Sequence, residues 1–230
     1  MNQDLYDLLH KCVDNTGLPV MHKELFLDTT EKYGKEEFRK TLAEFITKEK
    51  PPYPLKEYNM EKVVDNFRKL QKADFTNYLS QPTNVMEKYD DYKYSYKEYG
   101  LGIIDGPSSF NYCADSFMND LRMSCGSYGF KSPVQRWNDG DNIWGAFGPI
   151  WRGVNDSKNL TPKTYTMAFR LGTYIATQFK PIVAKTIYNM TDAKTILDTS
   201  MGWGDRLTAF YASNATHYIG CDPNPNTFAR

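Results

Sequence analysis

The chain has 230 residues with 28 basic and 28 acidic side chains, so its formal net charge is zero. This balance identifies no partner, and the nine basic against five acidic side chains of residues 151–230 are too mild a bias for a nucleic-acid footprint. No apolar run approaches the roughly 20 residues that a membrane span needs, and no signal peptide is recognisable. The four cysteines are far apart and lack ligand spacing, which predicts free thiols in a reducing compartment and no metal site.

Residues 1–50 are predicted to form a helical N-terminal region. Apolar residues at helical spacing define a first helix from Leu5 to Cys12, a second ends at Gly34, and a third follows. Two short helices joined at a glycine also fit a DNA-binding helix-turn-helix. Eleven acidic against nine basic side chains over residues 1–60 favour a packing region instead.

Residues 51–160 are predicted to form a second, mostly helical region that begins with a stiff proline-rich connector. Asn59 is expected to cap a helix that continues to about Leu79. The tyrosine-rich passage 89–99 fits either a surface strand or a segment that stacks on bases, and the alternation of Tyr with charged residues favours the strand.

Two further helices are expected in this region, one capped by Ser108 or Ser109 and one opened by Ser132 and the proline after it. The loop 138–153 then holds four glycines and two tryptophans. In one interpretation the aromatic rings of this loop stack on a ligand. In the other, the rings pack into the core and hold the loop against it. The sequence pattern does not separate these two interpretations.

Residues 161–230 are predicted to start a nucleotide-binding domain. A helix with Leu171 on its apolar face and a second with Ile187 directed inward precede a strand that ends at Asp198. A glycine turn, a helix from Asp205 and a second strand follow, which is the order that opens a doubly wound sheet. The predicted fold class is therefore α/β: a helical N-terminal region plus the first β-α-β unit of a Rossmann-like domain.

The turn between these strands carries the candidate ligand site. Gly202 and Gly204 let the backbone approach a ligand closely, and the first turn of the next helix offers free N–H groups. Asp222 follows the second strand, eighteen residues after Gly204, where an acidic residue accepts hydrogen bonds from ribose hydroxyls.

Two ligand classes compete for this site. A dinucleotide fingerprint would place glycine or alanine at Leu207, and the carboxylates of Asp198 and Asp205 would repel a pyrophosphate. Asp198 could instead accept an ammonium group, directly or through water. A ligand with an ammonium, a ribose and no phosphate is S-adenosylmethionine, which this reasoning prefers to NAD.

The segments 198–207, Asp-Thr-Ser-Met-Gly-Trp-Gly-Asp-Arg-Leu, and 218–225, Tyr-Ile-Gly-Cys-Asp-Pro-Asn-Pro, resemble motifs I and II of class I S-adenosylmethionine-dependent methyltransferases. The nearest likeness is to amino-group, adenine-type DNA methylases of phages and large viruses. The segment from Phe179 to Tyr188 is similar to the one that precedes motif I in these enzymes. Thr199 replaces their usual proline, and the likeness covers only residues 176–230.

This resemblance implies methyl transfer to an exocyclic amine of a nucleic-acid base, with adenine N6 of DNA favoured, in the cytoplasm of a microbial or virus-infected cell. The cofactor-binding residues it implies are Lys180, Asp198, Ser200, Gly202, Gly204, Asp205, Asp222 and Pro223. Asp205 is also a candidate helix cap, and Arg206 a candidate structural ion pair.

The methylases of this group also use an Asn/Asp-Pro-Pro-Tyr/Phe motif that contacts the flipped base. No such tetrapeptide occurs in the chain, so no catalytic residue is predicted. We expect a fragment, inactive alone, whose catalytic half lies elsewhere. The alternatives are a non-catalytic cofactor-binding or assembly module and, disfavoured by Asp198 and Leu207, a nicotinamide-dependent oxidoreductase.

Overall fold

The computed structural model describes residues 2–73, 79–80, 103–104, 106–153, 155–171 and 173–230. The chain forms two compact units, each built from two stretches of sequence. Unit 1 comprises residues 1–56 and 120–176, and unit 2 comprises residues 57–119 and 177–230. This division differs from the three consecutive regions predicted, because the chain enters each unit twice.

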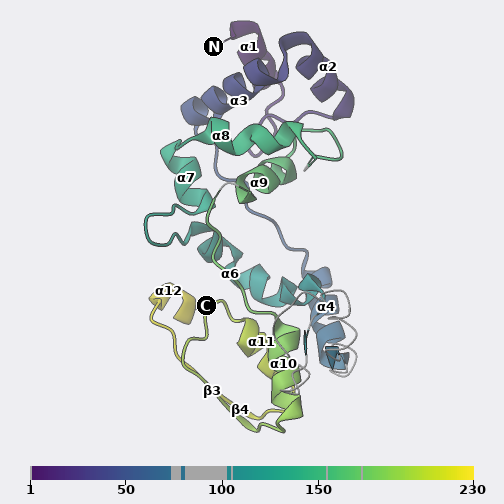
Figure 1. Cartoon of the computed structure of the whole chain (residues 1–230), viewed down its shortest axis with the longest axis vertical. Helices are drawn as coiled ribbons and strands as arrows, with labels where there is room; N and C mark the ends of the chain where they lie inside the picture. Colours follow the sequence, from purple (N-terminus) through teal and green to yellow (C-terminus); the bar gives the residue numbers. More distant parts are fainter. Residues whose placement is uncertain (1, 74–78, 81–102, 105, 154, 172) are drawn as a thin grey trace, which may run out of the picture. The chain divides into compact units, whose positions relative to one another are not determined.

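Unit 1 is helical (Figure 1). Its helices are α1 (Gln3–Lys11), α2 (Lys23–Tyr33), α3 (Lys35–Glu49), α7 (Pro133–Asp139), α8 (Ile143–Phe147), η3 (Gly148–Trp151) and α9 (Pro162–Arg170). Local signals set several of their ends. Gly34 separates α2 from α3 at a φ of 75°, and Ser132 forms a complete capping box at the start of α7. The predicted helices of residues 1–50 and the predicted cap at Ser132 are confirmed.

Helices from both stretches of unit 1 share one apolar core. Phe38 of α3, Trp137 of α7 and Phe169 of α9 are buried together in it. The indole N–H of Trp137 donates to the carbonyl of Pro51 at 2.7 Å, which fixes the proline-rich connector to this core. Leu171, predicted on the apolar face of its helix, lies just beyond α9 and is 63 % exposed.

The glycine-rich segment 138–153 is not an open loop, because α8 and η3 occupy most of it. Phe147 is fully buried, and the Trp151 ring packs against Phe26 and Phe38. These rings anchor the segment to the core, as one of the two interpretations expected. Trp144 is different, since 46 % of it remains exposed.

Unit 2 contains helices and two short strand pairs. Its elements are α4 (Met60–Lys72), β1 (Leu79–Ser80), β2 (Ile103–Ile104), η2 (Ser108–Asn111), the first part of α6 (Tyr112–Ser124), α10 (Pro181–Met190), β3 (Thr195–Asp198), α11 (Asp205–Tyr211), β4 (His217–Gly220) and α12 (Pro225–Phe228). Asn59 caps α4 as predicted, but α4 ends at Lys72 rather than near residue 79. The tyrosine-rich passage 89–99 lies outside the described residues.

Helices α4 and α10 meet through an unusual polar contact. Lys185 of α10 is 3 % exposed, and its ammonium donates to the carbonyls of Leu70, Gln71 and Ala73 at 2.6, 2.8 and 2.8 Å. These carbonyls belong to the C-terminal end of α4, where helical N–H partners run out. Ile187, predicted to point inward, is instead 44 % exposed, because α10 turns Lys185 toward α4.

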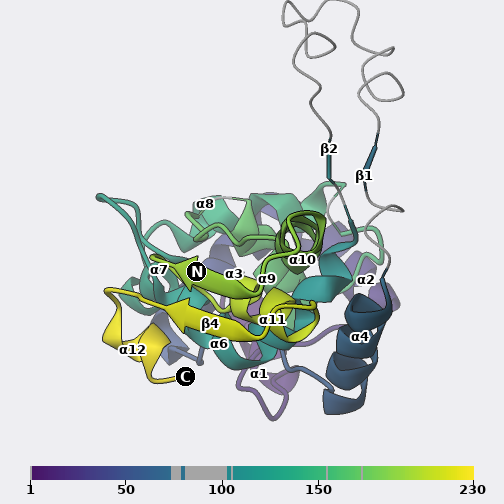
Figure 2. The same ribbon diagram turned by 90° about the horizontal axis from the view of Figure 1, so that it is seen from below.

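Strands β3 and β4 pair in parallel, with Asp198 opposite Gly220, and α11 connects them (Figure 2). The predicted strand-turn-helix-strand order is confirmed. The described residues thus form a mostly helical protein with a two-stranded parallel sheet, consistent with the α/β class. None of the described helices combines the length and apolar character required to cross a membrane.

Candidate functional site

The turn after β3 is shaped by its two glycines. Gly202 and Gly204 have φ angles of 59° and 77°, in the left-handed region that side chains disfavour. A Cβ built on Gly202 would meet only the carbonyl oxygen of Ser200, at 3.7 Å, so the space beside it is open. These glycines are therefore required by backbone conformation, and they leave one side of the turn uncovered.

Asp222 ties the end of β4 to this turn. Its Oδ2 accepts a hydrogen bond from the Gly202 N–H at 2.8 Å, and its Oδ1 accepts one from the Asn224 N–H at 2.9 Å. The carboxylate is half-buried, and each oxygen retains a second lone pair. Asp222 can thus hold the turn and still accept hydrogen bonds from a ligand.

Asp198 is 7 % exposed and fully engaged with protein groups. Its carboxylate accepts hydrogen bonds from Arg206 Nε (2.7 Å), Arg206 Nη2 (3.1 Å), the Tyr218 hydroxyl (2.6 Å) and the Ser200 N–H (3.3 Å). Burial raises the pKa of Asp198, but these hydrogen bonds outweigh it and hold the pKa below its ordinary value. Burial and the bond to Asp198 raise the pKa of the Tyr218 hydroxyl. Arg206 therefore forms the predicted structural ion pair, and the direct acceptor role of Asp198 stays a prediction.

Asp205 begins α11 and is 2 % exposed. Its Oδ1 accepts a hydrogen bond from Asn111 Nδ2 at 2.9 Å, and the same amide nitrogen donates to the carbonyl of Phe179 at 3.0 Å. The N-cap residue of α11 is Gly204, which makes no side-chain cap, so Asp205 does not occupy the N-cap position. Asn111 was not predicted as a site residue, because it lies 94 positions before Asp205 and belongs to no motif.

A pocket of about 250 Å³ opens beside the turn. It is lined by Thr177, Gln178, Phe179, Ser200, Met201, Gly202, Trp203, Asp205 and Arg206. The Trp203 indole N–H donates to the carbonyl of Thr177 at 3.1 Å, and the Arg206 guanidinium lies 5.3 Å from the centroid of the Phe179 ring. These contacts join the segment before α10 to the turn and form two walls of the pocket.

The pocket gathers some of the predicted site residues but not all. Ser200, Gly202 and Asp205 line it. Five predicted residues are not part of its lining: Lys180, Asp198, Gly204, Asp222 and Pro223. Two of them are nevertheless hydrogen-bonded to lining residues, Asp198 to Arg206 and Asp222 to Gly202. Lys180 is exposed at the N-cap position of α10 and makes no side-chain cap.

No known family matches the chain. Comparison with protein-family models, with curated proteins and with solved structures found no similar protein. Within the described part of the chain, no group of three or more His, Cys, Asp and Glu side chains is placed to hold a metal ion.

Proposed function

We propose that the chain supplies the cofactor-binding part of an S-adenosylmethionine-dependent methyltransferase. The observation that carries this proposal is the hydrogen bond from the Gly202 N–H to Asp222. It brings a glycine turn and an acidic residue from the next parallel strand side by side, which is the arrangement that binds an adenosyl ribose in Rossmann-like folds. The Rossmann-like character of this β-α-β unit is part of the proposal.

The charges around the pocket fit a cationic ligand better than a phosphorylated one. Asp205 and Arg206 line the pocket, and Asp198 pairs with Arg206 behind it. The two carboxylates outnumber the one guanidinium, so the local charge is negative and disfavours a pyrophosphate. A ligand with a positively charged sulfonium and an amino-acid end is compatible with this charge. In this arrangement the pocket receives the amino-acid end of the ligand, and the free lone pairs of Asp222 receive the ribose hydroxyls.

The proposed acceptor is an exocyclic amine of a nucleic-acid base, with adenine N6 of DNA favoured. This part rests on the resemblance of residues 198–207 and 218–225 to amino-group DNA methylases. When bound, S-adenosylmethionine would supply the methyl group. The residues of this chain would orient it and exclude water from it, which accelerates transfer mainly through positioning.

Calorimetric titration with S-adenosylhomocysteine tests the cofactor site. Asp222→Ala is expected to weaken binding at least about tenfold, because hydrogen bonds to a charged acceptor contribute roughly 1.5–3 kcal/mol each. Asp192→Ala is the matched control, since that carboxylate is 81 % exposed and lies outside the pocket. A folded wild-type chain that does not bind S-adenosylhomocysteine would refute the proposal, and binding of NAD instead would favour an oxidoreductase.

The absence of an Asn/Asp-Pro-Pro-aromatic tetrapeptide supports a second candidate, a cofactor-binding module that performs no catalysis. Both candidates predict binding of S-adenosylhomocysteine. They differ in a methyl-transfer assay with radiolabelled S-adenosylmethionine and unmethylated DNA, carried out on the protein purified together with its natural partners, because the chain alone is expected to be inactive. Incorporation of label would exclude the non-catalytic module.

A further inference from the structure

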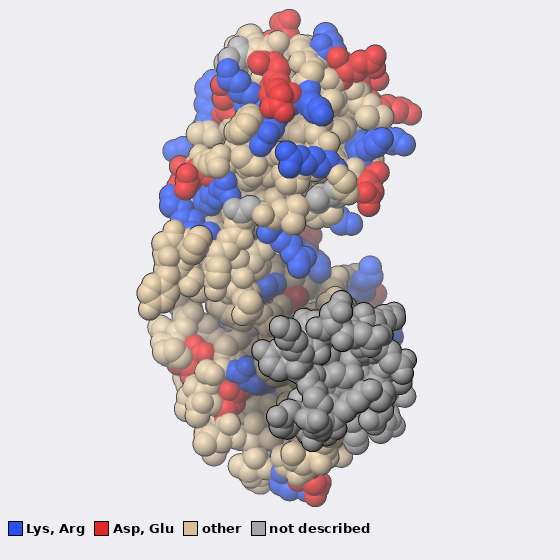
Figure 3. Space-filling view, in the orientation of Figure 1, with Lys and Arg blue, Asp and Glu red and all other residues tan. Residues whose placement is uncertain are grey.

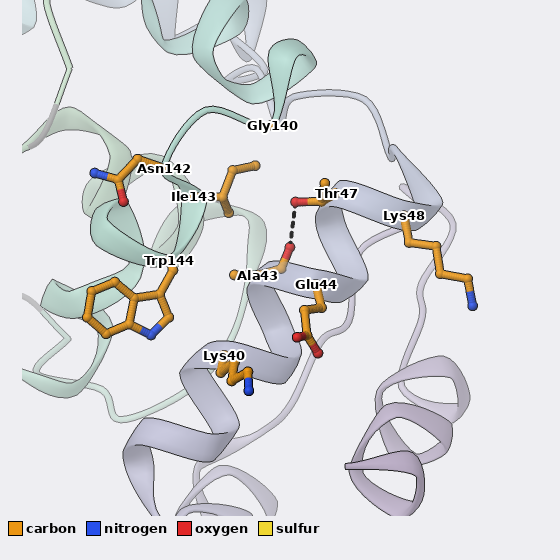
Figure 4. A pocket seen from close by; sticks show the side chains of 9 residues that line it. All are labelled: Lys40, Ala43, Glu44, Thr47, Lys48, Gly140, Asn142, Ile143 and Trp144. Carbon is orange, nitrogen blue, oxygen red and sulfur yellow. Dashed lines mark hydrogen bonds between the residues drawn. The ribbon is translucent and has the colours of Figure 1, made fainter. Parts of the chain in front are cut away.

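Unit 1 carries a groove that the proposed cofactor site does not use (Figure 4). Its volume is about 670 Å³, and it lies between α3 and the segment that contains the start of α8. Its lining is Lys40, Ala43, Glu44, Thr47, Lys48, Gly140, Asn142, Ile143 and Trp144. Apolar groups of Ala43 and Ile143 form part of the lining, and polar side chains of α3 stand along one edge.

Trp144 is the aromatic residue among those that line this groove, and Arg39 holds its ring in place. The Arg39 guanidinium carbon lies 3.6 Å from the centroid of the Trp144 ring. Arg39 Nε and Nη2 also donate to the carbonyls of Trp144 and Gly145 at 2.6 and 3.1 Å. One face of the ring is thus covered by a cation that is itself fixed by two backbone contacts. The exposed part of the ring is preorganised for stacking.

Basic side chains exceed acidic ones at this groove. Lys40 and Lys48 line it from α3, eight residues or about 12 Å apart along the helix axis. Arg39 pairs with Glu36 at 3.8 Å, and Glu44 stands between the two lysines. The ammonium of Lys48 lies over the Tyr6 ring, so Lys40 is the better placed of the two lysines.

Arg39, which holds the Trp144 ring, is itself partly buried beside other charged groups. The pKa of Arg39 is lowered, first by burial and also by the charge of Arg152, against the effect of Glu36. On the face shown in Figure 3, Lys and Arg are interspersed with Asp and Glu. Among the residues that line the groove, the two basic side chains of Lys40 and Lys48 exceed the single acidic side chain of Glu44, which favours an anionic occupant.

We propose that this groove binds single-stranded nucleic acid, with one base stacked on Trp144 and phosphates contacting Lys40. A flat, fixed aromatic ring beside cationic side chains is the combination that binds single strands without sequence preference. An acidic peptide would satisfy the charges but would leave the exposed ring without a stacking partner. The choice of a nucleic acid rests on the proposed function, for which the groove would hold the acceptor polymer.

The test is fluorescence anisotropy of a short fluorescein-labelled single-stranded DNA, titrated with the full chain in the absence of cofactor. Trp144→Ala is expected to weaken binding roughly 5- to 150-fold, the range for loss of one stacked base, whereas Trp144→Phe keeps most of the affinity. Lys40→Gln is expected to reduce the salt dependence by about 0.7 in the slope of log K against log salt concentration.

Two control variants in unit 1 lie outside the groove. Phe130→Ala removes an aromatic ring that is 69 % exposed, and Lys163→Gln removes an exposed lysine of α9. Both should bind the strand like the wild type. Circular dichroism of each variant verifies that it is folded, and Trp144→Phe keeps the test valid if Trp144→Ala unfolds.

A folded wild type that binds no strand would overturn the proposal, as would groove variants that bind like the controls. Displacement by polyglutamate together with no effect of Trp144→Ala would identify an acidic polypeptide as the occupant and also overturn it. Because cofactor is omitted, the two proposals fail separately. A chain that binds the strand but not S-adenosylhomocysteine refutes only the proposed function, and the reverse result refutes only the groove.

Discussion

Replacing Lys185 by methionine removes a buried ammonium while nearly keeping the volume of the side chain. The three carbonyls of Leu70, Gln71 and Ala73 then lose the ammonium as a donor, and the Leu70 carbonyl keeps, among the described residues, only the Ala73 N–H at 3.2 Å. A buried acceptor left unpaired costs about 1–3 kcal/mol. Only the bond to Leu70 is buried, while the other two are partly buried and their carbonyls can be rehydrated in part.

The ammonium itself is stripped of water in the folded state, so its removal recovers some free energy. The loss nevertheless dominates, because the carbonyls of α4 remain at the end of the helix and no apolar side chain can satisfy them. We therefore expect Lys185→Met to lower the free energy of unfolding by about 2–4 kcal/mol, which corresponds to about 4–16 °C in melting temperature for a protein of this size.

Thermal and urea unfolding followed by circular dichroism measure this difference. Lys62→Met is the matched control, because Lys62 is an exposed residue of α4 and its replacement should change stability by less than about 0.5 kcal/mol. If Lys185→Met and Lys62→Met unfold at the same temperature, the three hydrogen bonds do not stabilise the fold and the reasoning is wrong.

Three further substitutions have expected outcomes. Asp198→Asn should remove part of the loss of stability that the wild type shows in acid. The pKa of Asp198 is lower in the folded than in the unfolded chain, where it is about 3.9, so the ionised carboxylate stabilises the fold above that pH and this contribution is lost as the pH falls through the folded pKa. Urea midpoints of the two proteins between pH 7 and pH 2 measure the difference. Gly204→Ala should lower the free energy of unfolding by about 1–2 kcal/mol through backbone strain, because the φ of Gly204 is 77° and the atom nearest to a new Cβ is 3.9 Å away. Gly153→Ala is the control: its φ is not positive and nothing lies within 4 Å of a new Cβ, so it should unfold like the wild type. Ser132→Ala should lower stability by about 0.5–2 kcal/mol through loss of the capping box of α7, and Ser132→Asp should restore part of it; equal melting temperatures for Ser132→Ala and the wild type would contradict this.

The sequence predicts those parts of the fold that local chemistry decides. Asn59, Ser132 and Gly34 mark helix ends through their own side-chain or backbone preferences, and the structure confirms all three. The strand, glycine turn and helix from β3 to α11 were also predictable, because a short apolar run and two glycines define them within a few positions.

Features that depend on distant segments were not predictable. Lys185 is a polar residue within an apolar helix pattern, and its burial depends on carbonyls 115 positions earlier in the chain. Asn111 reaches the site only because unit 2 combines two stretches of sequence. The division into units was missed for the same reason, since no local signal shows that the chain returns to a core it has already left.

The two hydrogen bonds from the Asn111 amide have a practical consequence for anyone who wishes to isolate the candidate cofactor site. Residues 177–230 expressed alone would contain the glycine turn and both parallel strands, yet Asp205 and the Phe179 carbonyl would lose their common donor. A minimal version must therefore carry residues 57–119 as well, for example by joining the two stretches of unit 2 through a short flexible linker.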